Sequence, residues 1–411
     1  MRLHSDEARD AANHHEQNTL GILTAPELPE EIIDQMKGSL PELLKQYVDE
    51  HIDWTIKTLT DPLSGTEGYS KEIMRELGKV KEEENWDLII SITDLPIFFQ
   101  RRLIVADADV KKNIAYISIP ALGAAPVKKR VREAIIQLVD EMHHGAASEY
   151  REEREGEHSG GKADLVEKTT VNKSSRDLTK RRFTEWISPI KRQSFARENS
   201  DVDVRYLVES RFSGFIRMIT GMVLANRPWT IFPAFKKVLA AAFATGAYGL
   251  IFPNLWLLAN AYSTTRLITM MMVAITAMVA WIIVVHHLWE KKQDNHSSYL
   301  ANLYNVVTAL TLGIGVVFYY MMLYGIFLIT VFLFIPPLML EYELGRDVGV
   351  GIFFVIAWLV TSVATLVGAI GAGLESENTI LKATYGHRQQ IRRQQAKEER
   401  EKEEESGSTD S

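Results

Sequence analysis

LYNVVTALTLGIGVVFYYMMLYGIFLITVFLFIPPLML, residues 303–340, decides the fold of this chain, because it is a long apolar stretch without one charged residue. A continuous helix of this length, at about 1.5 Å per residue, would measure about 57 Å, nearly twice the hydrocarbon core of about 30 Å. The stretch therefore predicts either one over-long membrane helix or two short spans. The choice determines on which side of the membrane the C-terminus lies.

Three other apolar stretches complete a membrane domain. They are residues 238–260, 267–289 and 350–374, each close to the roughly 20 residues that a membrane helix needs. Basic residues gather before the first, after the second and after the last of these spans: Lys236, Lys237, Lys291, Lys292, Lys382, Arg388, Arg392 and Arg393. Because basic flanks stay in the cytoplasm, we expect a multi-pass cell-membrane protein with four spans and both termini cytoplasmic. Five spans are the alternative, and they would place the basic C-terminal segment outside.

With four spans, residues 303–340 cross the membrane once, as a long, tilted helix that extends beyond the bilayer. Two prolines near its end stop a helix, and three glycines inside it permit a bend. The candidate break and hinge positions are Gly313, Gly315, Gly325, Pro336 and Pro337.

The last span is rich in small residues spaced four apart, a spacing that lets two helix backbones approach closely. The residues that would form this surface are Ala364, Gly368, Gly371, Ala372 and Gly373. Two interpretations remain open, self-association of the protein and packing of helices within one chain.

The N-terminal part of the chain is rich in charged side chains and predicts a soluble α/β or α+β domain with one sheet. Alternating or continuous apolar runs predict strands at 51–59, 86–96, 102–107 and 114–120. Amphipathic patterns predict helices at 29–47, 69–84 and 127–142. From the N-terminus we expect a disordered tail (1–25), a cytoplasmic α/β domain (26–144), a flexible charged linker (145–200), an amphipathic juxtamembrane helix (201–235), a transmembrane helical domain (236–375) and a charged cytoplasmic C-terminal helix or tail (376–411).

Composition excludes several classes of function. The chain has no cysteine, which excludes a disulfide framework, a thiol nucleophile and cysteine-ligated metal sites. A formal net charge of −7 gives no case for a nucleic-acid partner. The first residues, MRLHSDEARDAANHHEQN, have no apolar core of the kind a signal peptide needs, so we expect the soluble domain to stay in the cytoplasm.

Catalytic signals are weak. Asp94, Asp107 and Asp109 follow or end predicted strands, where active sites of α/β domains often lie, although aspartate is also a common turn former. His143 directly follows the helix at 127–142, where the helix dipole favours a cation. That helix lacks the His-Glu-x-x-His pattern of zinc peptidases. No dinucleotide, phosphate-loop or nucleophile-elbow motif occurs. We expect no metal and no cofactor, and the balance favours a non-enzymatic role.

Six stretches resemble a family of uncharacterised polytopic membrane proteins from actinobacteria and Gram-positive relatives, which carry an N-terminal cytoplasmic α/β domain. They are WDLIISITDLP (86–96), ISIPALG (117–123), ANRPW (225–229), LYNVVTALTL (303–312), GAGLES (371–376) and ATYG (383–386). The resemblance covers most of residues 26–390. More remotely, the order of strands before the helix at 127–142 is similar to metzincin-like folds, without their zinc motif.

The sequence therefore predicts a self-associating membrane scaffold with a cytoplasmic binding or assembly domain. Its expected partners are membrane lipids, a second copy of the chain and a cytoplasmic protein. Two alternatives stay open: a channel or transporter, suggested by hydroxyl groups in the spans, and a membrane-tethered hydrolase that uses His143 or the Asp94 and Asp107 pair.

Overall fold

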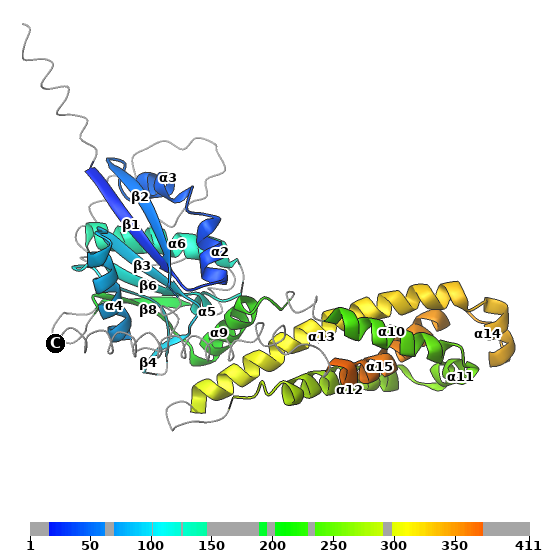
Figure 1. Cartoon of the computed structure of the whole chain (residues 1–411). Coiled ribbons are helices and arrows are strands. Elements are labelled where there is room, and N and C mark those ends of the chain that lie inside the picture. The colour runs from blue at the N-terminus through cyan, green and yellow to red at the C-terminus, as the bar shows by residue number, and fades with distance from the viewer. Residues whose placement is uncertain are drawn as a thin grey trace, which may run out of the picture. The chain divides into compact units, whose positions relative to one another are not determined.

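The computed structural model describes residues 16–61, 70–100, 102–124, 126–145, 189–194, 202–228, 235–290 and 298–372. The chain divides into two compact units, with the boundary between Ala225 and Asn226. The first unit is an α/β domain and the second is a bundle of apolar helices (Figure 1). The expected C-terminal helix or tail, 376–411, and most of the expected linker, 145–200, lie outside the described residues.

A single mixed sheet forms the first unit, with strand order β2-β1-β3-β6-β5-β8-β7 and β4 paired to β5 at one end. The four strands β2, β1, β3 and β6 are parallel, whereas β5, β8 and β7 continue the sheet in antiparallel pairs. The strands are β1 (Glu16–Thr24), β2 (Ile52–Thr60), β3 (Leu88–Thr93), β4 (Ile97–Phe99), β5 (Arg102–Asp109), β6 (Ile114–Ser118), β7 (Ile190–Ser194) and β8 (Val204–Val208).

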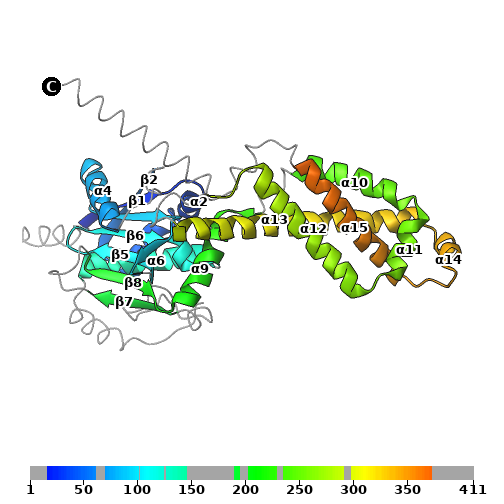
Figure 2. The same cartoon turned by 90° about the horizontal axis from the view of Figure 1, so that it is seen from below.

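Helices cover this sheet and connect its parallel strands (Figures 1 and 2). Met74 and Leu77 of α4 pack with Ile89 of β3 and Tyr116 of β6 in one apolar core. The helices of the unit are α2 (Leu28–Asp34), α3 (Leu40–Tyr47), α4 (Ser70–Glu83), α5 (Ile119–Leu122), α6 (Val127–His144) and α9 (Arg211–Ala225). The predicted N-terminal α/β domain is therefore confirmed, including the strands near 51–59 and 114–120 and the helix near 127–142.

Three boundaries of this domain were wrong. Part of the expected disordered tail forms β1, whose Leu20 and Ile22 are fully buried between two parallel neighbours. The expected linker contributes β7, and the expected juxtamembrane helix begins with the buried strand β8 before α9 starts at Arg211. The physical reason is shared: these short strands are ordered by hydrogen bonds and packing with strands that are distant in the sequence, so their own local pattern does not identify them.

The second unit consists only of helices among its described residues (Figure 2). They are α10 (Lys236–Leu250), α11 (Pro253–Ala261), α12 (Thr264–Val285), α13 (Ser298–Phe334), α14 (Pro337–Leu344) and α15 (Gly351–Ala372). Three of them, α12, α13 and α15, are long and apolar enough to cross a membrane, and the bent pair α10–α11 makes up to four. The membrane domain expected from the sequence is confirmed at this level.

Most of the long stretch at 303–340, up to Phe334, belongs to one uninterrupted helix. α13 continues through Gly313 and Gly325, and at about 1.5 Å per residue its 37 residues extend about 55 Å. It ends at Phe334, and Pro336 caps the short helix α14 that begins at Pro337. The two prolines thus end the helix where the sequence places the stop.

The first apolar stretch differs from the single helix expected at 238–260. It is two helices, α10 and α11, with an angle of 90° between them. Pro253 opens α11, and the preceding Phe252 has an extended backbone, because the proline ring disfavours a helical residue before it. The break leaves α10 with 15 residues, about 22 Å of helix.

Helix α15 is the centre of the bundle. In an 18-residue apolar stretch of α15, 61% is buried within the chain, whereas only 17% of the corresponding stretch of α12 is buried. Its glycine Gly368 is one cause: a Cβ atom there would lie 3.2 Å from the Cβ of Ala242 on α10 and 2.7 Å from the Tyr319 hydroxyl oxygen on α13. Gly246 of α10 similarly faces Phe327 and Ala364.

We expect Gly21→Val to destabilise the α/β domain by at least about 3 kcal/mol, the upper end of the cost of overpacking. A Cβ atom at Gly21 would lie 1.6 Å from the Cε3 atom of the buried Trp86 ring, so strand or ring must move. Hydrogen exchange of the β1 and β3 amides in the detergent-solubilised full-length protein measures the change. Gly38→Ala is the matched control, because no atom lies within 4 Å of the added methyl group. Equal stability of the two variants would contradict this packing.

Candidate functional site

A buried ion pair joins β5 to β8. Arg205 donates from Nε and Nη2 to the two carboxylate oxygens of Asp107, at 2.9 and 2.8 Å, and the Tyr116 hydroxyl donates to the same carboxylate at 2.8 Å. The Asp107 side chain is fully buried and the guanidinium of Arg205 stacks 4.2 Å above the Phe99 ring. Burial acts to lower the pKa of Arg205, but the hydrogen bonds and the charge of Asp107 outweigh it and raise that pKa.

A second ion pair joins α6 to β7, between the buried Glu141 and the partly buried Arg192. Arg192 donates from Nε and Nη2 to the two oxygens of Glu141, at 2.9 and 3.0 Å, and the Tyr206 hydroxyl donates to Glu141 at 2.9 Å. Tyr206 follows Arg205 on β8, and successive side chains of a strand point to opposite faces of the sheet. The two ion pairs therefore lie on opposite faces, and both involve the last two strands of the domain.

Three potential metal ligands meet where α3 leads into β2 and where α6 ends. Asp49, His143 and His144 each offer one ligand atom, and these atoms lie within 4.8 Å of one another. The Nε2 atom of His143 is 3.5 Å from Oδ2 of Asp49, and the two imidazole rings meet edge to face with centroids 4.6 Å apart. All three residues are partly buried, so an ion from solvent can reach them.

Neighbouring groups fix the orientation of these side chains. Asp140, one turn earlier on α6, lies 3.2 Å from Nδ1 of His144. The backbone N–H of His51 donates to Oδ1 of Asp49 at 2.9 Å, and the Trp54 ring packs edge-on against His143. Burial acts to raise the pKa of Asp49, but hydrogen bonds from His51 and His143 outweigh it and lower that pKa. Asp49 is therefore ionised at neutral pH.

The aspartates that the sequence grouped together lie apart. Asp94 follows the end of β3 and is buried, whereas Asp107 lies on β5 opposite Tyr116. β6 lies between β3 and β5, so these two strands are roughly 10 Å apart. Because β5 runs antiparallel to β6, Asp109 pairs with Ile114 at the opposite end of the strands from Asp94. The structure therefore does not assemble Asp94, Asp107 and Asp109 into one site, and it gives His143 different neighbours, Asp49 and His144.

In the membrane unit, the small residues that the sequence singled out face other helices of the same chain where their side chains are described. Ala364 and Gly368 contact α10 and α13, as described above. Gly371 and Ala372 continue α15, and Gly373 lies beyond the described residues. Of the buried hydroxyls nearby, Tyr320 and Ser362 hydrogen-bond each other at 2.8 Å.

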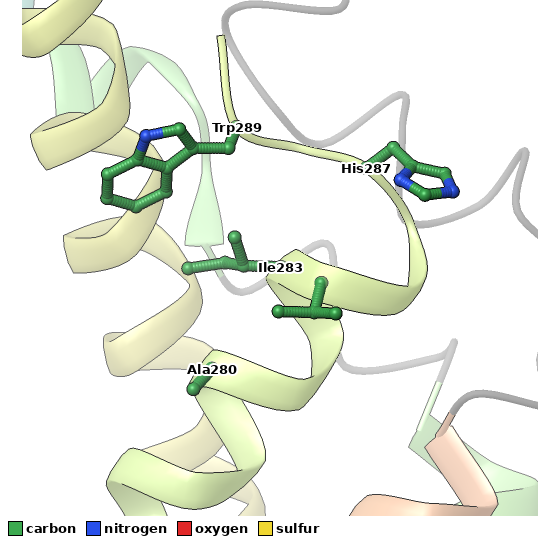
Figure 3. Close-up of a pocket in the computed structure, with 5 residues that line it drawn as sticks. Ala280, Ile283, His287 and Trp289 are labelled. Atoms are coloured by element: carbon green, nitrogen blue, oxygen red, sulfur yellow. The ribbon is translucent and has the colours of Figure 1, made fainter. Parts of the chain in front are cut away.

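The outer surface at the end of α12 contains a pocket of about 490 Å³. It is lined by Ala280, Ile283, Val284, His287 and Trp289. Figure 3 shows Trp289 on the same side of the helix end as Ala280, while His287 lies on the other side. More than half of the Trp289 surface is exposed, as is common for an aromatic ring at a membrane boundary.

Comparison of the chain with family models, with curated proteins and with solved structures finds no match. Inference about function therefore rests on the geometry of the two units.

Sequence reasoning missed the residues that matter most in the α/β domain. Arg205 is 98 residues from Asp107, and Asp49 is likewise far from His143, so no local spacing connects the partners. One signal was present: the pair His143-His144 with Asp140 four residues before the second histidine places a carboxylate one helical turn away.

We expect Asp107→Asn to destabilise the α/β domain by about 3–5 kcal/mol, because it leaves a buried guanidinium without its counter-charge. Hydrogen exchange of the β5 and β8 amides measures the loss. Asp34→Asn is the control, since the Asp34–Lys37 pair is about half exposed and surface pairs contribute at most about 1 kcal/mol. A loss at Asp107 no larger than that at Asp34 would refute the role of the buried pair.

Proposed function

We propose that this chain is a four-pass membrane scaffold that self-associates through its membrane domain and holds the α/β domain in the cytoplasm as a binding or assembly module. The observation that carries the proposal is the packing of unit 2. Its central helix α15 is enclosed by helices of its own chain, while α12 leaves most of its apolar surface uncovered. The family resemblance stated from the sequence is compatible with this function and stays a proposal.

The interior of the bundle supports a scaffold more than a conduit through one chain. Helices α13 and α15 contain no Asp, Glu, Lys or Arg, although transport pathways for ions usually keep such groups at membrane depth. Their facing side chains fill the interior with an apolar core that includes Leu312, Val316, Phe327 and Ile356, all fully buried.

The uncovered faces supply the surface for self-association. On α12, Met272 and Val273 are each 54% exposed, and on α13 Met321 is 60% exposed. Lipid covers such residues in a monomer, whereas a second copy buries them by close helix packing. Because Ala364 and Gly368 already pack within the chain, we place the interface on the outer faces of α12 and α13.

The arrangement of helix ends supports four passes with both termini on one side. The first turns of α10, at Val238 and Ala242, lie against Gly368 near the end of α15. At the other end of α10–α11, Asn260 accepts a hydrogen bond from Arg346, which follows α14. The chain therefore enters the bundle at the end where α15 finishes and reaches the opposite end before α12 begins, as an even number of crossings requires. The basic residues that flank the spans favour the cytoplasmic side for this shared end.

Because the natural chain has no cysteine, single-cysteine variants test self-association directly. We expect Met272→Cys or Met321→Cys to give a disulfide-linked dimer when membranes are oxidised, because these side chains point away from the bundle. Ala364→Cys is the matched control, since its side chain is enclosed within the chain and should not cross-link. If cysteines introduced one at a time around the exposed faces of α12 and α13 all leave the protein monomeric after oxidation, this interface is ruled out.

Sidedness is tested by cysteine labelling of intact cells with a membrane-impermeant maleimide. We expect Tyr342→Cys, on the 86%-exposed position of α14, to be labelled from outside. Lys57→Cys, exposed on β2, should react only after the cells are permeabilised. Protection of position 342 together with labelling of position 57 would reverse the proposed orientation, and protection of both would contradict the four-pass arrangement.

A further inference from the structure

The cluster of Asp49, His143 and His144 joins two parts of the α/β domain that are distant in sequence. Asp49 lies between α3 and β2, and the two histidines occupy the last turn of α6. Two imidazole nitrogens and one carboxylate oxygen are the set that three-ligand zinc sites use, with water in the remaining position.

The geometry of the cluster is close to that of a metal-bound set of ligands. Zinc bonds to histidine nitrogen and carboxylate oxygen are about 2.0–2.1 Å, so neighbouring ligands of a tetrahedral ion lie about 3.4 Å apart. The His143 Nε2 atom and the Asp49 Oδ2 atom are 3.5 Å apart, and the third ligand atom lies within 4.8 Å of both.

The surroundings supply what a metal site needs beyond its ligands. Asp140 lies 3.2 Å from Nδ1 of His144, and a carboxylate in this position typically orients and strengthens a histidine ligand. His51 holds the other oxygen of Asp49 and so fixes the carboxylate. The negative end of the α6 dipole adds attraction for a cation at the same place.

We propose that Asp49, His143 and His144 bind one divalent transition-metal ion of the zinc type. The ion would be held by three protein ligands and keep at least one water molecule. Because it links the turn before β2 to the end of α6, binding stabilises the α/β domain. This proposal does not depend on self-association of the membrane domain, since all its ligands belong to the first unit.

Isothermal titration of the metal-free, detergent-solubilised full-length protein with Zn²⁺ tests the proposal. We expect one saturable site per chain and a higher thermal unfolding temperature with the metal. Asp140→Ala should weaken binding by about 10–100-fold, the usual effect of removing a hydrogen bond to a ligand. The double variant H143A/H144A should lose the site entirely.

A double variant H14A/H15A is the matched control, because it removes another adjacent histidine pair from the same chain and should bind Zn²⁺ normally. Should H143A/H144A fail to fold, the natural protein loaded with Co²⁺ gives a second readout: visible absorption of a tetrahedral nitrogen and oxygen site, absent in Asp49→Asn. Absence of a one-to-one site in the natural protein would overturn the proposal, as would equal Zn²⁺ affinity in the two double variants.

Discussion

The structure of the α/β domain depends on two contacts, each between a buried carboxylate and an arginine. Arg205 donates two hydrogen bonds to Asp107, and Arg192 donates two to Glu141. Each carboxylate also accepts a hydrogen bond from a tyrosine hydroxyl. A carboxylate buried alone would be costly, so each pair is stable only when β7 and β8 are in place. The sheet of this domain is therefore completed by β7 and β8, and β8 comes directly before α9 in the sequence. This makes residues 202–225 part of the folded domain rather than a tether to it.

A different constraint organises the membrane unit. In lipid there is little hydrophobic force between helices, so close packing of small residues determines which helices associate. Gly246, Ala364 and Gly368 supply that packing and place α15 between α10 and α13. The same contacts bury Ala364 and Gly368 within the chain, and the proposed self-association therefore relies on the uncovered sides of α12 and α13.

Local sequence patterns predicted what local physics determines. The continuous apolar run at Leu88–Thr93, the amphipathic helix ending at His144 and the stop at Pro336 each have a signal within a few residues, and each was placed correctly. The predictions that failed involve distant partners. β1 looked polar because only Leu20 to Leu23 are apolar, and β8 was assigned to the expected amphipathic helix at 201–235, because basic and apolar residues alternate through that region. Arg205 instead belongs to a strand and meets a carboxylate 98 residues away. The cluster around His143 was missed for the same reason.

Cleavage of the chain between the two parts of the domain tests the central claim most directly. A recognition sequence for a specific protease, inserted after Gly160, allows the full-length protein to be cut in isolated membranes. If β7 and β8 complete the sheet through the buried ion pairs, the N-terminal fragment stays with the membranes after cutting and leaves them only under denaturing conditions. Release of that fragment into the soluble fraction under native conditions would contradict the account.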